Sequence, residues 1–155
     1  HFWADMNVKV LGYLRTAREV APEMVQRKWG RIINVSGLAA RSTGTIIGSI
    51  RNVSVAALTK NIADELAGTG VSAVCIHPGL TRTEKTPGVA AKTAEKLGIS
   101  VADAEAQMAS KNLTKRLITA DDIAAVAAFV ASPRSVAING DVIAAGGGAP
   151  GSIHY

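Results

Sequence analysis

The chain has 155 residues, of which 48% are hydrophobic and only 4% are aromatic. This length favours a single domain, residues 1–155, with a core built mainly from Ala, Val, Ile and Leu. The net charge of +5 comes from scattered basic residues without interleaved aromatics, so we expect no nucleic-acid partner. The single cysteine, Cys75, excludes an internal disulfide and a multi-cysteine metal site. We expect a cytoplasmic protein with no metal and no membrane segment.

A long helix is predicted over residues 2–27. Pro22 lies inside it and is expected to kink or split it, because proline lacks the backbone N–H that a helix interior needs. The β-branched run "RIINVS" at 31–36 is flanked by glycines and predicts a buried strand. The helix prediction rests on apolar residues at three- and four-residue spacing, namely Met6, Val10, Leu14, Ala17, Ala21 and Val25.

A second long helix is predicted over about residues 50–67 and is ended by "GTG". "VSAVCIH" at 71–77 predicts a second strand, which Pro78 and Gly79 terminate. A helical excursion of low hydrophobicity is predicted over 84–115, with Ser100 as a possible cap inside it.

A last helix is predicted to start at the capping pair Thr119 and Asp122, and "DVIAA" at 141–145 predicts the final strand. Helices that alternate with buried strands indicate an α/β fold with a parallel sheet covered on both faces. Three strands are fewer than such sheets usually have, so we expect that an upstream part of the domain precedes His1.

The order of these segments resembles the C-terminal half of the short-chain dehydrogenase/reductase family, which has a Rossmann-like, doubly wound fold. Four stretches carry the resemblance and together cover nearly the whole chain. They are "DMNVKVLGYLRTAREVAPEM", "GRIINVSG", "AALTKNIADELAGTGVSAVCIHPGLTRT" and "KRLITADDIAAVAAFVASPRSVAINGDVIAAGGG". The resemblance implies an NAD(P)-dependent oxidoreductase that acts on a small carbonyl or alcohol substrate.

The resemblance also implies an altered catalytic centre. The family's Tyr-x-x-x-Lys motif, aligned on "LTK" at 58–60, falls on Gly48 and Asn52, neither of which can replace an acid and its cation. The family's serine aligns with Gly37, one position after Ser36. If Ser36 continued the strand, its side chain would point to the face of the sheet opposite to that of residue 37. Asn7 aligns with the family's helix asparagine. Asn7, Ser36 and Asn52 are therefore the candidate catalytic residues of an atypical or lost triad.

The loop after the second predicted strand resembles the family's nicotinamide loop. The resemblance implies that Pro78, Gly79, Leu80, Thr81 and Thr83 contact NAD or NADP in the parent protein. The family's Gly-rich turn, which binds the pyrophosphate at a helix N-terminus, has no counterpart in the sequence. We therefore expect that the chain alone is inactive and binds neither cofactor.

Three functions are compatible with the sequence. The first is an oxidoreductase fragment, and the second is a non-catalytic member of the family that binds a nucleotide or assists protein assembly. The third is a structural fragment with no ligand of its own. In each case the resemblance implies a homodimer or homotetramer, formed through the helices near 2–27 and 50–67.

Overall fold

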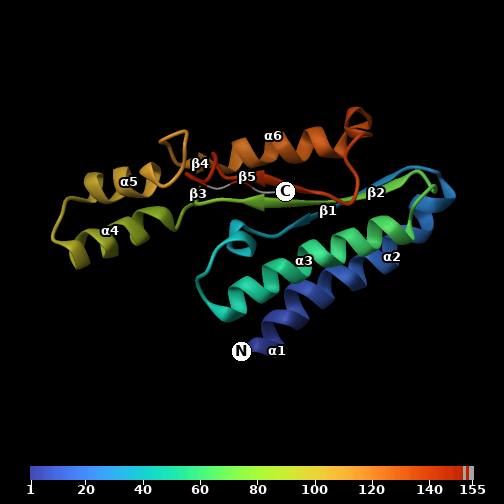
Figure 1. The fold of residues 1–155 in the computed structure, drawn as a ribbon, viewed down its shortest axis with the longest axis horizontal. Helices are drawn as coiled ribbons and strands as arrows, with labels where there is room; N and C mark the ends of the chain where they lie inside the picture. The colour runs from blue at the N-terminus through green and yellow to red at the C-terminus, as the bar shows by residue number, and fades with distance from the viewer. Residues whose placement is uncertain (152, 154–155) are drawn as a thin grey trace.

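The computed structural model describes residues 1–151 and 153, and three parallel strands form the main sheet of this part of the chain (Figure 1). Their order is β1-β2-β5, with Val35 opposite Ile76 and Cys75 opposite Val142. The α/β class and the parallel sheet are thereby confirmed. The strands are β1 (Gly30–Val35), β2 (Val71–Pro78) and β5 (Val142–Ala145).

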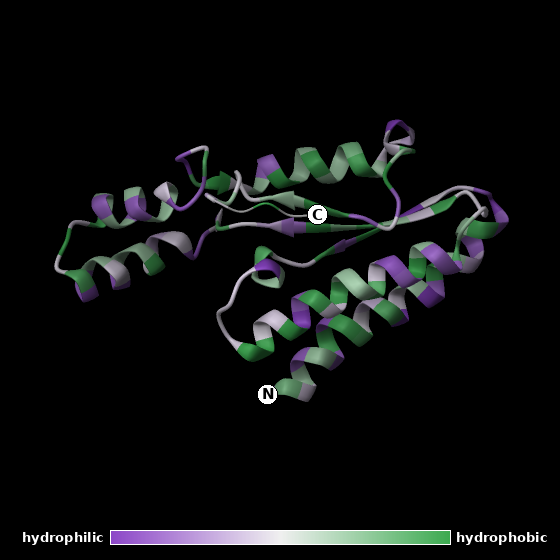
Figure 2. Cartoon of the chain, in the orientation of Figure 1, coloured by the Kyte–Doolittle hydropathy of each residue, from purple (hydrophilic) through white to green (hydrophobic). Residues whose placement is uncertain are grey.

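Helices cover both faces of the sheet (Figure 1). The amino-terminal helices and α3 lie on one face, whereas α6 packs on β1 and β2 from the other. Figure 2 shows that α6 is hydrophobic beyond its first turn. No helix in residues 1–151 is long and apolar enough to cross a bilayer. The helices are α1 (Phe2–Asp5), the π-helix η1 (Met6–Leu11), α2 (Gly12–Gln26), α3 (Ile46–Glu65) and α6 (Ala120–Ala131).

The main core lies between the sheet and the two long helices. β2 is buried along its length because β1 and β5 flank it and helices cover both of its faces. Small side chains at the helix–sheet contacts allow close packing, in keeping with a core that has few aromatic residues. The buried members are Ala17, Ile32, Ile62, Ala63, Val71 and Ala73.

The predicted excursion forms a helical hairpin that projects beyond the carboxyl ends of the strands (Figure 1). It consists of α4 (Thr86–Leu97) and α5 (Val101–Ser110), and its small core contains Ala90, Met108 and Leu117. The two-residue strands β3 (Thr81–Arg82) and β4 (Ile118–Thr119) pair in parallel and join the two ends of the excursion. Two 3-10 turns lie outside this excursion: η2 (Leu38–Arg41) follows β1, and η3 (Pro133–Ser135) follows α6.

Pro22 does not split the first helix, because α2 continues through Pro22 to Gln26. Because Pro22 and Arg18 are exposed, water can bind the Arg18 carbonyl that has no N–H partner at position 22. The irregularity lies earlier, at the π-helical turn η1.

The second long helix begins four residues earlier than predicted. α3 starts at Ile46 because the Thr45 hydroxyl accepts a hydrogen bond from the Gly48 amide at 3.1 Å and caps the helix. Gly48 therefore lies inside the first turn of α3. A Cβ at this position would approach the Thr45 hydroxyl to 2.7 Å, so a side chain there would disturb the cap.

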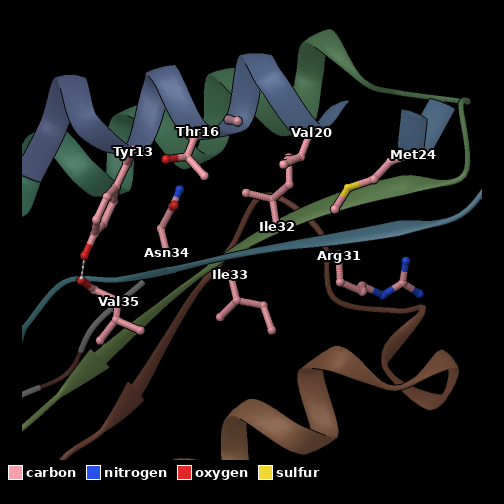
Figure 3. Close-up of a pocket in the computed structure, with 10 residues that line it drawn as sticks. Tyr13, Thr16, Val20, Met24, Arg31, Ile32, Ile33, Asn34 and Val35 are labelled. Atoms are coloured by element: carbon pink, nitrogen blue, oxygen red, sulfur yellow. Dashed lines mark hydrogen bonds between the residues drawn. The ribbon is translucent and has the colours of Figure 1, made fainter. Parts of the chain in front are cut away.

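The outer edge of β1 has no strand beside it in the described residues. A groove of about 370 Å³ lies along this edge and against α2, as Figure 3 shows. The Tyr13 hydroxyl crosses the groove and donates to the Val35 carbonyl at 2.8 Å. The remaining edge groups are positioned to pair with a further strand.

His77, near the end of β2, is buried without a partner. Its side chain is only 2% exposed, and neither ring nitrogen has a hydrogen-bond partner in the described residues. Burial, together with the positive charges of Arg41 and Lys9, lowers the pKa of His77 to about 4. The neutral imidazole is therefore the form that the folded protein accommodates.

The low pKa of His77 makes stability depend on pH. In the unfolded chain the histidine pKa is about 6.5, so the unfolded state takes up the proton first as the pH falls. We expect stability to be complete above pH ~6.5 and to decrease by about 3 kcal/mol as the pH falls to ~4. Urea denaturation of the His77→Leu variant should lack this decrease, whereas His1→Gln, at the exposed terminus, should retain it. An equal decrease in wild type and His77→Leu would contradict the assignment.

Gly70 permits the tight turn between α3 and β2. Its φ is +86°, and an added methyl group would overlap the Lys28 carbonyl oxygen, which is backbone and cannot move aside. We expect Gly70→Ala to lower the free energy of unfolding by more than about 2 kcal/mol. Gly68→Ala is the matched control: its φ is +76° but its methyl would meet open space, so only about 1 kcal/mol of strain is expected. Equal urea midpoints for the two variants would contradict this prediction, because they would show that the backbone shifts to relieve the overlap with the Lys28 carbonyl oxygen.

Candidate functional site

A cavity of about 490 Å³ opens at the carboxyl ends of β1, β2 and β5. In open parallel α/β sheets this edge is where ligands bind. The cavity is bounded by the chain after each of the three strands and by the end of α5. Its lining includes Ser36, Gly37, Leu38, Ser42, Pro78, Gly79, Leu80, Met108, Lys111, Asn112, Gly146 and Gly148.

Two glycines bring the ends of β2 and β5 into close contact at the floor of this cavity. A Cβ on Gly79 would lie 2.6 Å from the Gly146 Cα atom, and one on Gly146 would lie 2.9 Å from the Gly79 Cα atom. The Gly79 amide also donates to the Ala145 carbonyl at 3.3 Å. Larger residues would force the two chain segments apart, so the glycines allow the ends of β2 and β5 to pack closely at this edge of the cavity.

A polar cluster lies beside the cavity and joins three elements. The Ser36 hydroxyl, just after β1, lies 3.0 Å from both the carbonyl oxygen and the Oδ1 atom of Asn52, and donates to this pair. Asn52, buried on α3, donates from its side-chain Nδ2 to the Gly48 carbonyl at 2.9 Å. The Lys9 ammonium, from η1, donates to the Ser36 carbonyl at 3.3 Å and to Asn52 Oδ1 at 3.2 Å.

The environment of Lys9 disfavours its positive charge. The side chain is half-buried, and burial together with the nearby Arg51 guanidinium lowers the pKa of Lys9, although the Cys75 thiol acts in the opposite direction. The carboxylate of Asp5 does not compensate, because it pairs with Arg51 at 2.8 Å. Lys9 is thus a cation that is held mainly by neutral oxygen acceptors.

The structure brings together two of the three candidate catalytic residues. Ser36 does not point away from the site, because β1 ends at Val35 and Ser36 already lies in the following loop. Asn7 is not part of the cluster: it is exposed, and its Oδ1 atom accepts from Arg15 at 2.8 Å. The side chain that reaches the cluster from this helix is Lys9.

Our sequence analysis missed Lys9, although a signal was present. Lys9 lies three residues after Met6 and four before Tyr13, which places it beside the inward-facing apolar stripe of the first helix. A lysine there must either extend to solvent or find acceptors inside. In the structure Lys9 finds acceptors inside, because it lies on the π-helical turn and the Ser36 carbonyl and Asn52 Oδ1 accept its hydrogen bonds.

The predicted cofactor loop is only partly at the cavity. Pro78, Gly79 and Leu80 line it, whereas Thr81 and Thr83 are not among its lining residues. The Thr81 hydroxyl donates to the Gly79 carbonyl at 3.1 Å, and the Thr83 hydroxyl accepts from the Lys85 amide at 3.3 Å. Both hydroxyls therefore shape the turn that follows β2.

Comparison with known proteins gives consistent matches. A family model described as enoyl-(acyl carrier protein) reductase matches residues 1–150. The NADPH-dependent reductase BacG of Bacillus subtilis is 32% identical over 152 residues, which make up 97% of this chain and 59% of BacG. The chain spans about half the length of the curated relatives that it matches.

Solved structures match over the same extent. YwfH, an NADPH-dependent reductase involved in bacilysin biosynthesis, superposes with a TM-score of 0.82 at 31% identity, covering 92% of this chain and 56% of YwfH. L-sorbose reductase from Gluconobacter frateurii, solved with NADPH and L-sorbose, gives a TM-score of 0.89 at 21% identity over 98% of this chain and 59% of the reductase, a likeness of fold alone. With a family match over nearly its whole length and a Rossmann-like fold that agrees, the chain belongs to the short-chain dehydrogenase/reductase family.

Proposed function

We propose that the protein is an NAD(P)-dependent oxidoreductase that interconverts a carbonyl group and an alcohol on a small molecule. The observation that carries this proposal is the position of the Lys9–Ser36–Asn52 cluster. Its member Ser36 lines the cavity at the carboxyl ends of the strands, as does the loop Pro78–Leu80, and Lys9 and Asn52 are hydrogen-bonded to Ser36 behind it. A donor of this cluster that reaches the cavity can polarise a carbonyl oxygen beside a bound nicotinamide ring.

The cavity fits the nicotinamide end of the cofactor. It has a volume of about 490 Å³ and lies at the carboxyl ends of the strands, and a bound nicotinamide would supply or accept the hydride. Within residues 1–151 no glycine-rich turn leads into a helix in the way that pyrophosphate binding requires. We propose that a segment outside residues 1–155 binds the rest of the dinucleotide. Since BacG and YwfH are described as NADPH-dependent, NADPH is the first cofactor to test.

A second function, a non-catalytic nucleotide-binding or assembly module, is favoured by one observation. Gly48, aligned with the family's tyrosine, has no side chain, and the Thr45 cap opposes one there. A member of the family without a proton donor would retain the cavity and could still bind a nucleotide. Both functions allow nucleotide binding, but only the oxidoreductase would turn over a carbonyl substrate.

The test of catalysis is a carbonyl-reduction assay with the full-length protein. We expect NADPH or NADH oxidation with at least one small ketone or aldehyde. The variant Ser36→Ala should lower kcat/KM by about fivefold or more, because one hydrogen bond that positions the cluster is worth about 1 kcal/mol or more. Thr93→Ala, exposed on α4, should have no effect. Saturable cofactor binding without turnover of any carbonyl compound would favour the non-catalytic module instead.

We also propose that the protein forms a homodimer or homotetramer through the outer faces of α1–α2 and α3. The support is a stripe of exposed apolar residues on one face of α3, formed by Ile46, Ile50 and Val53, with Trp3 and Val8 exposed on the neighbouring helices. A second copy has the same stripe, so two copies can cover each other.

This assembly can be tested by light scattering. We expect wild-type protein to have the mass of a dimer or tetramer. Val53→Lys should reduce this mass, because an ammonium in an apolar interface loses its hydration. Val89→Lys, at an equally exposed valine on α4, should leave the mass unchanged. A monomeric wild type, or a Val53→Lys variant that assembles normally, would contradict the proposed interface.

A further inference from the structure

The cluster beside the cavity contains one strong proton donor, and it comes from an unexpected element. We propose that Lys9 is the proton donor of this site and takes over the task that the family's Tyr-x-x-x-Lys motif performs from the α3 positions of Gly48 and Asn52. This proposal rests on the function proposed above. It assigns a catalytic role to a residue of η1 that the alignment with the family motif does not indicate.

The hydrogen bonds of Lys9 leave one proton free to act. An ammonium group carries three N–H donors. Two of them are directed at the Ser36 carbonyl and Asn52 Oδ1, and no further acceptor is found among residues 1–151 and 153. Ser36 lines the cavity; Lys9 is not among the lining residues but lies one hydrogen bond, 3.3 Å, from the Ser36 carbonyl, with one N–H unassigned. The proposal requires that a substrate oxygen bound beside Ser36 accept that bond.

The position of Asn52 is consistent with Lys9 providing the positive charge that the family's motif lysine provides. Where the family's motif has a lysine, this chain has a neutral amide whose Oδ1 atom accepts from Lys9 at 3.2 Å. A cation is thus present next to this position, but η1 supplies it instead of α3. The π-helical turn belongs to this arrangement, since such turns widen a helix locally and occur often at functional sites.

The charges around Lys9 favour release of its proton. The groups that face it are Arg51 from α3, and Cys75 and His77 from β2. Burial and Arg51 lower the pKa of Lys9, and His77 is neutral near pH 7 because its own pKa is about 4. An ammonium with a lowered pKa is a stronger acid than an exposed lysine and transfers its proton more readily.

A reduced nicotinamide bound in the cavity would supply the hydride to the carbonyl carbon, and the electron pair of the C=O π bond would move onto the oxygen. That oxygen takes the free proton from Lys9 Nζ, which yields the alcohol and a neutral amine. Lys9 then recovers a proton from solvent through the open cavity. In the alcohol-to-carbonyl direction, the neutral amine is the base that removes the hydroxyl proton.

Two variants of Lys9 separate proton donation from charge. Lys9→Met removes both properties, whereas Lys9→Arg keeps the charge but cannot donate a proton, because a guanidinium stays protonated near neutral pH. In the full-length protein we expect both variants to lower kcat by about 100-fold or more, with cofactor affinity changed less than about threefold. Lys92→Met, on the exposed surface of α4, should retain wild-type kcat.

The pKa of Lys9 gives a readout that does not depend on activity. Acetylation measured by mass spectrometry over a range of pH, without cofactor, should show Lys9 reacting at lower pH than Lys92. The wild-type kcat for reduction should fall as the pH rises through that same pKa, and Lys9→Met should lack this limb.

Three results would overturn the assignment of Lys9 as the proton donor. Activity retained in Lys9→Arg, or kcat within about threefold of wild type in Lys9→Met, would overturn Lys9 as the donor while leaving the oxidoreductase function in place. A Lys9 that titrates like Lys92 would also overturn it. Absence of turnover in wild-type protein that binds NADPH would instead overturn the proposed function and this role with it.

Discussion

The parallel pairing of β2 with β1 on one side and β5 on the other is the constraint on which the rest of the structure depends. Parallel pairing places the carboxyl ends of all three strands at one edge. Ser36, the Pro78–Gly79 turn and Gly146 therefore meet around one cavity although they are far apart in the sequence. The close approach of Gly79 to Gly146 is possible only because neither residue carries a side chain.

Polar residues on the sheet-facing side of α3 hold this helix in register over the strands. Thr59 accepts a hydrogen bond from Asn34 of β1 at 2.9 Å, and both side chains are buried. Two turns earlier, Asn52 accepts from Ser36 and Lys9. Buried polar groups are costly unless paired, so these bonds oppose sliding of α3 along β1. The same bonds place Asn52 at the end of β1, where the cavity begins.

The first turns of α3 and the polar cluster belong to one arrangement. The Thr45 cap occupies the space beside Gly48, and Asn52 is an acceptor for Lys9 instead of a cation. If Lys9 donates the proton, the site has kept a charged donor beside the cavity and moved its origin from α3 to η1. The pairing of Asp5 with Arg51 fits this arrangement, because it leaves Lys9 without a carboxylate that would raise its pKa.

Local patterns were sufficient to predict most of the fold. The β-branched runs near 31–36, 71–77 and 141–145 are strands, and Thr119 with Asp122 caps α6, because strand propensity and capping depend on neighbouring residues. The site could be predicted only in part. Asn7 and Lys9 lie two residues apart on one helix, and the helical pattern, which places Lys9 beside the apolar stripe, cannot decide whether its ammonium extends to solvent or turns inward. That choice depends on the π-helical turn and on acceptors from Ser36 and Asn52, 27 and 43 residues away in sequence. The sequence alone determined the order of elements, whereas only tertiary packing decided that a lysine enters the site, because a buried ammonium is stable only where distant segments supply its acceptors.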